Sequence, residues 1–126
     1  MIFTGYAAPK TDDALPEVVT LTSDAAEFLA NLPVRAYGTD AFGVDDIADT
    51  GMPWIHHSFL SRSIPVYEQL CNLDKLLGRE KMFFVGVPLN IKDGDGMIVR
   101  PVVFIYDCSK SSPTARVEFA EDLLRK

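Results

Sequence analysis

Two adjacent histidines and one glutamate are the residues whose types and spacing best suit chemistry. His56 and His57 are the two histidines of the chain, and Glu68 follows His56 by twelve positions. Imidazole and carboxylate groups are ligands that zinc and manganese accept. Neighbouring side chains lie about 100° apart on a helix and on opposite faces of a strand, so we expect only one histidine to face a given site. Catalytic zinc usually takes three protein ligands, and surface or helix-capping histidines remain the alternative.

Other polar residues are weaker candidates. Four aspartates could form an acidic, cation-binding loop: Asp40, Asp45, Asp46 and Asp49. They do not follow the calcium-loop pattern, and the later segment 93–96 lacks the downstream glutamate of that pattern, so we expect solvated turns in both places. Three serines lie near the histidines, Ser58, Ser61 and Ser63, but the chain has no Gly-x-Ser-x-Gly elbow. We therefore assign no catalytic residue, and no glycine-rich phosphate loop predicts nucleotide binding.

The composition argues against several classes of function. At 126 residues the chain fits one domain, residues 1–126, and a hydrophobic content of 48% suits a folded globular protein. A net charge of -6 gives no basic surface for nucleic acid or for an anionic membrane. Without an apolar run of about 18 residues or a signal sequence, a cytoplasmic protein is expected. Cys71 and Cys108 have no Cys-x-x-Cys spacing, so two buried free thiols are expected.

Short helices and strands must position the histidines and the glutamate. The predicted order begins with a strand at residues 1–6, a helix capped by Thr22 or Ser23 and ended by Pro33, a buried strand at 34–38, a helical turn at 55–63, an extended segment at 64–68 and a second helical turn at 70–77. The candidate ligands His56 and Glu68 thus fall on a helical turn and on the extended segment that follows it.

A β-hairpin and a terminal helix are predicted for the rest of the chain. Residues 81–89 are nearly all apolar, which indicates a strand covered on both faces. The turn signal at 93–96 joins it to a second strand at 98–106. Residues 112–126 carry an apolar stripe at helical spacing and predict an additional helix. We expect that stripe to cover exposed surface or to mediate self-association.

Four segments together resemble the carboxyl-terminal part of the cyclase family of metal-dependent hydrolases, the kynurenine formamidase-like proteins. They are IFTGYA, LTSDAAEFLANLPVRAYGTDAFGVDD, HHSFLSRSIPVYEQLCNLDKL and VGVPLNIKDGDGMIVRPVVF, and they cover about residues 2–106 in the expected order. The resemblance implies an α/β fold: a partial domain of the swivelling β/β/α type with a mixed sheet, a β-hairpin and flanking helices. Residues 112–126 extend past that pattern.

The resemblance also implies roles for the two candidate ligands. In family members with a two-metal site, the first histidine of such a segment and the glutamate twelve positions later bind metal, and these positions are His56 and Glu68. The family's other ligands come from an upstream His-x-Gly-Thr-His-x-Asp-x-Pro motif, which this chain lacks. A divalent ion held by two ligands stays mostly hydrated, so hydrolysis by one chain alone is not expected.

Three hypotheses for function follow. The first is a truncated cyclase-like protein that is non-hydrolytic and acts in binding or interaction, as a homo-oligomer that takes a small molecule or a protein in the old active-site region. The alternative is a metal-dependent amide or cyclic-amide hydrolase whose site, with zinc or manganese, is completed by a second copy or by a complementary chain. The third is an incomplete part of a full hydrolase.

Overall fold

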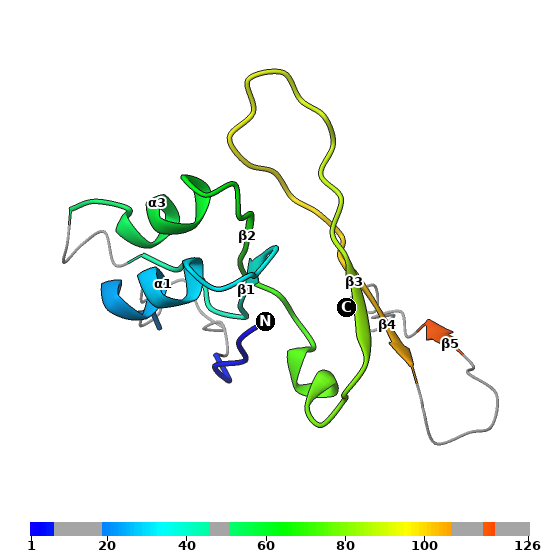
Figure 1. The fold of residues 1–126 in the computed structure, drawn as a ribbon. Coiled ribbons are helices and arrows are strands. Elements are labelled where there is room, and N and C mark those ends of the chain that lie inside the picture. Colours follow the sequence, from blue (N-terminus) through cyan, green and yellow to red (C-terminus); the bar gives the residue numbers. More distant parts are fainter. Residues whose placement is uncertain (7–18, 46–50, 107–114, 118–126) are drawn as a thin grey trace, which may run out of the picture. The chain divides into compact units, whose positions relative to one another are not determined.

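The structure is a computed structural model that describes residues 1–6, 19–45, 51–106 and 115–117. Its elements, drawn in Figure 1, are α1 (Ser23–Ala30), β1 (Tyr37–Gly38), α3 (Trp54–Leu60), β2 (Val66–Tyr67), a 3-10 turn η1 (Leu73–Leu76), β3 (Met82–Val85), β4 (Val102–Tyr106) and β5 (Ala115–Val117). The chain divides into two compact units, Met1–Lys75 and Leu76–Lys126, and each is described by itself.

Helix α1 begins and ends at the residues that the sequence indicates. Thr22 is its N-cap, with extended backbone angles, and its Oγ1 accepts a hydrogen bond of 3.3 Å from the backbone N–H of Ala25. Asp24 lies in the first turn, where a carboxylate favours the positive end of the helix. Asn31 closes the helix just ahead of Leu32 and Pro33, because proline disfavours helix in the residue before it. The predicted capped helix is confirmed.

The first unit contains a short parallel strand pair. Tyr37 of β1 is opposite Val66 of β2, and Gly38 is opposite Tyr67. At the amino terminus, Ile2 makes only an isolated parallel bridge to Thr39, so the strand predicted at residues 1–6 is not formed as such. The reason is that the backbone N–H groups after Ile2 are bound elsewhere, by the side chain of Asp40.

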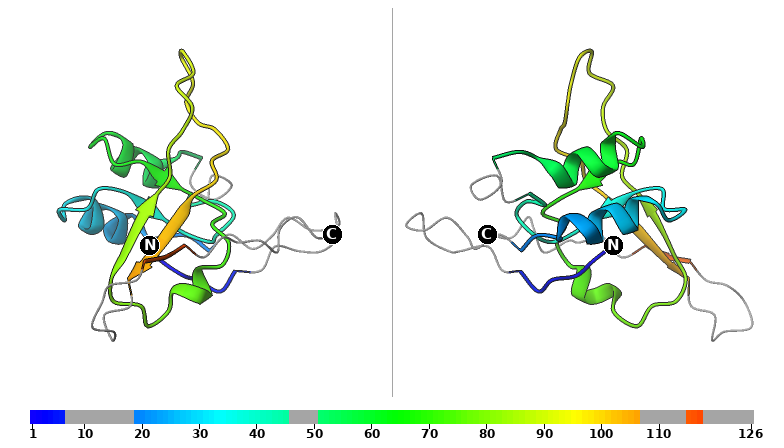
Figure 2. Two further views of the ribbon diagram at one scale, coloured as in Figure 1. Left: turned by 90° about the vertical axis from the view of Figure 1, so that its right-hand side faces the viewer. Right: turned by 60° about the vertical axis from the view of Figure 1, so that its left-hand side comes forward.

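Apolar residues from both helices, from β1 and from the adjoining loops form the core of this unit. Helices α1 and α3 pack against each other, as the views in Figure 2 show. The buried set is Ala26, Ala30, Tyr37, Val44, Ile55, Phe59 and Ile64. The Phe59 ring is fully buried and stacks on Tyr37, with ring centroids 4.8 Å apart. Burial raises the pKa of the Tyr37 phenol. This stack joins α3 to the strand pair.

The second unit is a three-stranded antiparallel sheet in the order β3-β4-β5. Met82 pairs with Ile105 and Val85 with Val102, which confirms the predicted hairpin, with a long connection between its strands (Figure 1). The strand predicted at 81–89 pairs only at 82–85 and is not covered on both faces, since Phe83 is 58% exposed. Among the described residues of this unit no α-helix covers the sheet, so an all-apolar run does not guarantee burial.

Several further expectations differ from the structure. Residues 115–117, predicted as helix, form β5 because β4 offers them a free edge for backbone pairing; the remainder of 112–126 lies outside the described residues. The parallel and antiparallel pairs occupy two separate small sheets in place of one mixed sheet, although helices and small sheets together are consistent with the α/β class. Cys71 is exposed, and Cys108 lies outside the described residues. No described helix has the length and apolar character to cross a membrane.

Replacing the buried ring at position 59 tests the core. Phe59→Ala should lower the free energy of unfolding by about 3–5 kcal/mol, because the substitution removes buried apolar surface and leaves a cavity. Phe28→Ala is the matched control, since Phe28 on α1 is 65% exposed and its loss should cost less than about 1 kcal/mol. Urea unfolding followed by circular dichroism measures both. Equal effects of the two substitutions would contradict this description of the core.

The Asp40 carboxylate predicts a dependence of stability on pH. Desolvation opposes its ionisation, but hydrogen bonds from Thr4 N and Oγ1 and from Gly5 N outweigh that effect and lower the pKa of Asp40. A lowered pKa in the folded state contributes stability that is present above the unfolded pKa of about 3.9 and is lost as pH falls through the folded pKa. Urea midpoints at pH 7 and pH 3 should therefore differ less in Asp40→Asn than in the wild type. An identical pH dependence would show that the carboxylate has no such role.

Candidate functional site

The two adjacent histidines lie on helix α3 in different surroundings. Its buried face carries Ile55 and Phe59, which belong to the core. His56 follows Ile55 and its side chain is 33% exposed, whereas His57 is exposed and lies in the last turn. The expectation that only one of two adjacent histidines faces a given site therefore holds for the helix. His56 is the one that the structure places in a polar network.

Asp45 is the buried centre of that network. The start of α3 has Pro53 as its N-cap, which supplies no side-chain hydrogen bond, so the first N–H groups need another acceptor. Asp45 supplies it: its Oδ1 accepts from Ile55 N at 2.6 Å and its Oδ2 from His56 N at 3.1 Å. The Asp45 side chain is only 4% exposed. A buried carboxylate needs such partners, and a helix start favours its negative charge.

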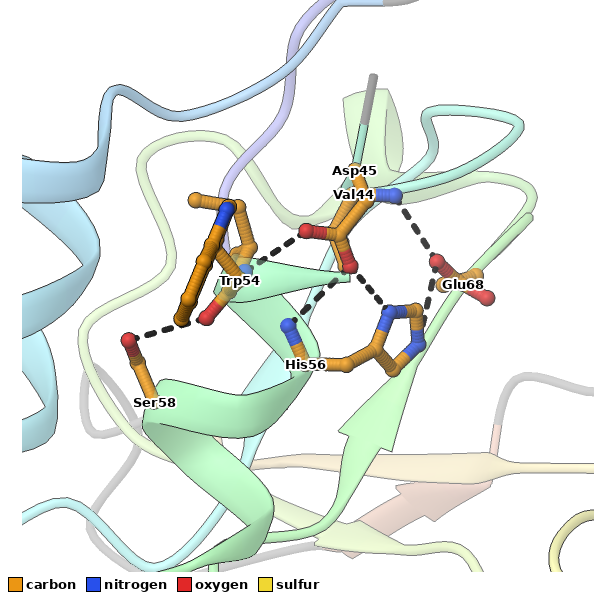
Figure 3. A network of polar contacts seen from close by, with 7 residues as sticks. Val44, Asp45, Trp54, His56, Ser58 and Glu68 are labelled. Carbon is orange, nitrogen blue, oxygen red and sulfur yellow. Dashed lines mark hydrogen bonds and ion pairs between the residues drawn. The ribbon is translucent and has the colours of Figure 1, made fainter. Parts of the chain in front are cut away.

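The same carboxylate holds the imidazole of His56. Asp45 Oδ2 lies 2.5 Å from Nδ1 of His56, and Nε2 on the other side of the ring lies 3.6 Å from Oε1 of Glu68. Glu68 follows β2, and its Oε1 also accepts a hydrogen bond of 2.8 Å from Val44 N. Figure 3 shows the ring between the two carboxylates. We refer to Asp45, His56 and Glu68 as the carboxylate–histidine network.

The geometry of this network fits two ligands of one divalent ion. Zinc lies about 2.1 Å from ligand nitrogen and oxygen atoms, so two ligand atoms can reach one ion when they are less than about 4.2 Å apart. The distance of 3.6 Å between His56 Nε2 and Glu68 Oε1 meets that condition. Asp45 contacts Nδ1, so Nε2 is the ring nitrogen that faces Glu68. Within the described ranges, no group of three or more histidines, cysteines or acidic residues is arranged to hold a metal.

The structure treats the other predicted polar residues differently from one another. Asp45 and Asp40 were expected in solvated turns, yet Asp45 is buried and Asp40 binds the amino-terminal backbone. Asp46 and Asp49 lie outside the described residues. Ser58 donates its hydroxyl to the carbonyl of Trp54 at 3.0 Å, within α3 (Figure 3). The sequence signal for the capping role of Asp45 is that Pro53, at the start of α3, has no side chain that can cap the helix.

Removing the Asp45 side chain tests its double role. Asp45→Ala should destabilise the protein by about 1–2 kcal/mol, the usual effect of losing a helix cap, and should free the His56 ring. Asp45→Asn retains one acceptor oxygen and should lose less. Chemical unfolding measures the first effect, and nuclear magnetic resonance of the ring nitrogens measures which tautomer His56 adopts in each variant. Unchanged stability and an unchanged ring signal in Asp45→Ala would contradict the network.

Comparison with known proteins finds a sequence similarity to a curated protein. A curated kynurenine formamidase from Salinibacter ruber is 33% identical over 104 residues, which are 82% of this chain and 48% of that enzyme. This chain thus spans about half the length of the curated relative that it matches. No family model and no solved structure matches. The comparison supports a distant relationship to kynurenine formamidase, the protein type that the resemblance indicated.

Proposed function

We propose that this chain is a cyclase-like relative of kynurenine formamidase that binds divalent metal weakly through His56 and Glu68 and acts in binding or interaction, without hydrolysis by the lone chain. The distant relationship to a hydrolase supports the origin of the site. Among the described residues only two ligands lie within reach of one ion. Two protein ligands leave an ion mostly hydrated and without fixed geometry, which supports the absence of hydrolysis at this pair alone.

The observation that carries the proposal is the orientation of His56. Histidines that bind metal usually donate their other ring N–H to a carboxylate or carbonyl, which fixes the tautomer and the ring direction. Asp45 makes this contact at 2.5 Å, and Nε2 faces the Glu68 carboxylate at 3.6 Å. A bound divalent ion would supply Lewis acidity at this position. His56 and Glu68 would hold the ion, and Asp45 would position His56.

A second candidate function is a hydrolase site completed by another chain. The partial exposure of the two ligands favours it, because His56 and Glu68 are 33% and 28% exposed and remain accessible to groups from a second molecule. A homo-oligomer could combine the pairs from two copies, giving two histidines and two glutamates. A complementary chain could instead supply the upstream histidines. Zinc or manganese is the metal whose ligand preferences suit these groups.

Metal titration with matched variants tests the shared part of both candidates. Calorimetric titration of the purified chain with zinc, and separately with manganese, should detect binding that His56→Ala and Glu68→Gln each weaken by at least about tenfold, or about 1.4 kcal/mol. His57→Ala is the control, because the exposed neighbour lies outside the network and its loss should leave the affinity unchanged. Equal affinity in His56→Ala and the wild type would contradict both candidates.

Activity and solution mass separate the two candidates. Native mass spectrometry gives the number of chains and of ions, and release of formate from N-formylkynurenine reports hydrolysis. Metal-dependent hydrolysis by a monomer would disprove the first candidate. Hydrolysis that appears only with a metal-bridged dimer, or after addition of a complementary chain, would support the second. A metal-binding protein that stays inactive in every assembly would support the first.

A further inference from the structure

The first unit has a surface pocket that shares no residue with the carboxylate–histidine network. It has a volume of about 340 Å³ and is lined by residues 3 and 6 of the amino-terminal segment, 40 and 42 after β1, and 69–74 after β2. None of these residues belongs to the network. The volume is at the lower end of the range of small-molecule sites, which is about 300–1,000 Å³. The pocket is therefore large enough for a small organic molecule.

One wall of the pocket is held in a fixed and costly backbone conformation. Gln69 and Asn72 both have positive φ angles, 55° and 61°, which non-glycine residues rarely adopt. Gln69 is kept there by two hydrogen bonds to the opposite loop: its N–H donates to the Ala41 carbonyl at 3.0 Å and its Nε2 to the Phe42 carbonyl at 3.3 Å. These contacts preorganise the lining, which lowers the entropy cost of binding a ligand.

The lining combines aromatic surface with negative charge. Phe3 and Phe42 are 42% and 49% exposed, so their rings remain available for contact. Asp40 and Asp74 bring carboxylates, and none of the described lining residues is a lysine, arginine or histidine. Both oxygens of Asp40 accept hydrogen bonds from the amino-terminal backbone. Asp40 therefore acts on a ligand through its negative charge and not through a direct hydrogen bond. Aromatic faces beside carboxylates attract cations and disfavour anions.

We propose that this pocket binds a small organic monocation, an amine with an apolar or aromatic body. The body packs between Phe3 and Phe42, and the ammonium group lies toward the carboxylates of Asp40 and Asp74. This inference goes beyond the proposed metal-binding function, because it concerns different residues and a different ligand class. The charge of a ligand would affect its affinity for the pocket more than its shape would.

Three probes of matched size test the selection by charge. Titrations of the full chain at pH 7, followed by ligand-observed magnetic resonance, use 2-phenylethylamine as the cation, 2-phenylethanol as the neutral analogue and phenylacetate as the anion. The amine should bind at least tenfold more tightly than the alcohol, and phenylacetate should bind more weakly still. Phenylacetate binding as tightly as the amine would overturn the proposal.

Matched variants locate the binding. Asp74→Asn and Phe42→Leu should each weaken amine binding about threefold or more, whereas Asp24→Asn and Phe28→Leu on α1 make the same changes at exposed positions outside the pocket and should leave it unchanged. Cys71, an exposed lining residue, reports occupancy independently: saturating amine should slow its alkylation by N-ethylmaleimide, measured on the peptide that contains it. An unchanged alkylation rate, or equal affinities in pocket and control variants, would place the amine elsewhere and overturn the proposal.

Discussion

One buried carboxylate joins the local fold to the candidate site. Asp45 has a side chain that is 4% exposed, and its two oxygens accept hydrogen bonds from the first turn of α3 and contact the His56 ring. A buried carboxylate requires hydrogen-bond donors, and the backbone N–H groups of Ile55 and His56 supply two of them. The start of α3 and the orientation of the His56 ring therefore both depend on Asp45. A change in the position of Asp45 would alter the site and would also destabilise the helix.

The parallel strand pair places both candidate sites at one edge. The network takes Asp45 from the loop after β1 and Glu68 from the residue after β2, and the pocket takes Asp40 and Gln69 from the same two connections. Carboxyl ends of parallel strands lie at the same edge of a sheet, and the loops that follow them commonly form binding sites. A pair of two-residue strands is enough to bring residues 40–45 next to residues 68–70.

The features predicted from sequence are those that depend on near neighbours. The cap at Thr22, the stop near Pro33 and the different directions of His56 and His57 follow from local geometry, and the structure has all three. The role of Asp45 was not predicted because the groups that it caps lie ten and eleven positions away and are backbone N–H groups, which any sequence offers. The separation into two sheets and the strand at 115–117 depend on which edges are free, and that information is not local.

The His56 side chain is the part of the network that the fold does not require. Asp45 is needed to cap α3, and Glu68 accepts the N–H of Val44, so both have structural reasons to be present. The helix start uses only the backbone N–H of His56, which any residue other than proline would provide at that position. The imidazole, one-third exposed between two carboxylates, is therefore not a group on which the helix start depends. This asymmetry is the structural reason for centring the proposed metal-binding role on His56.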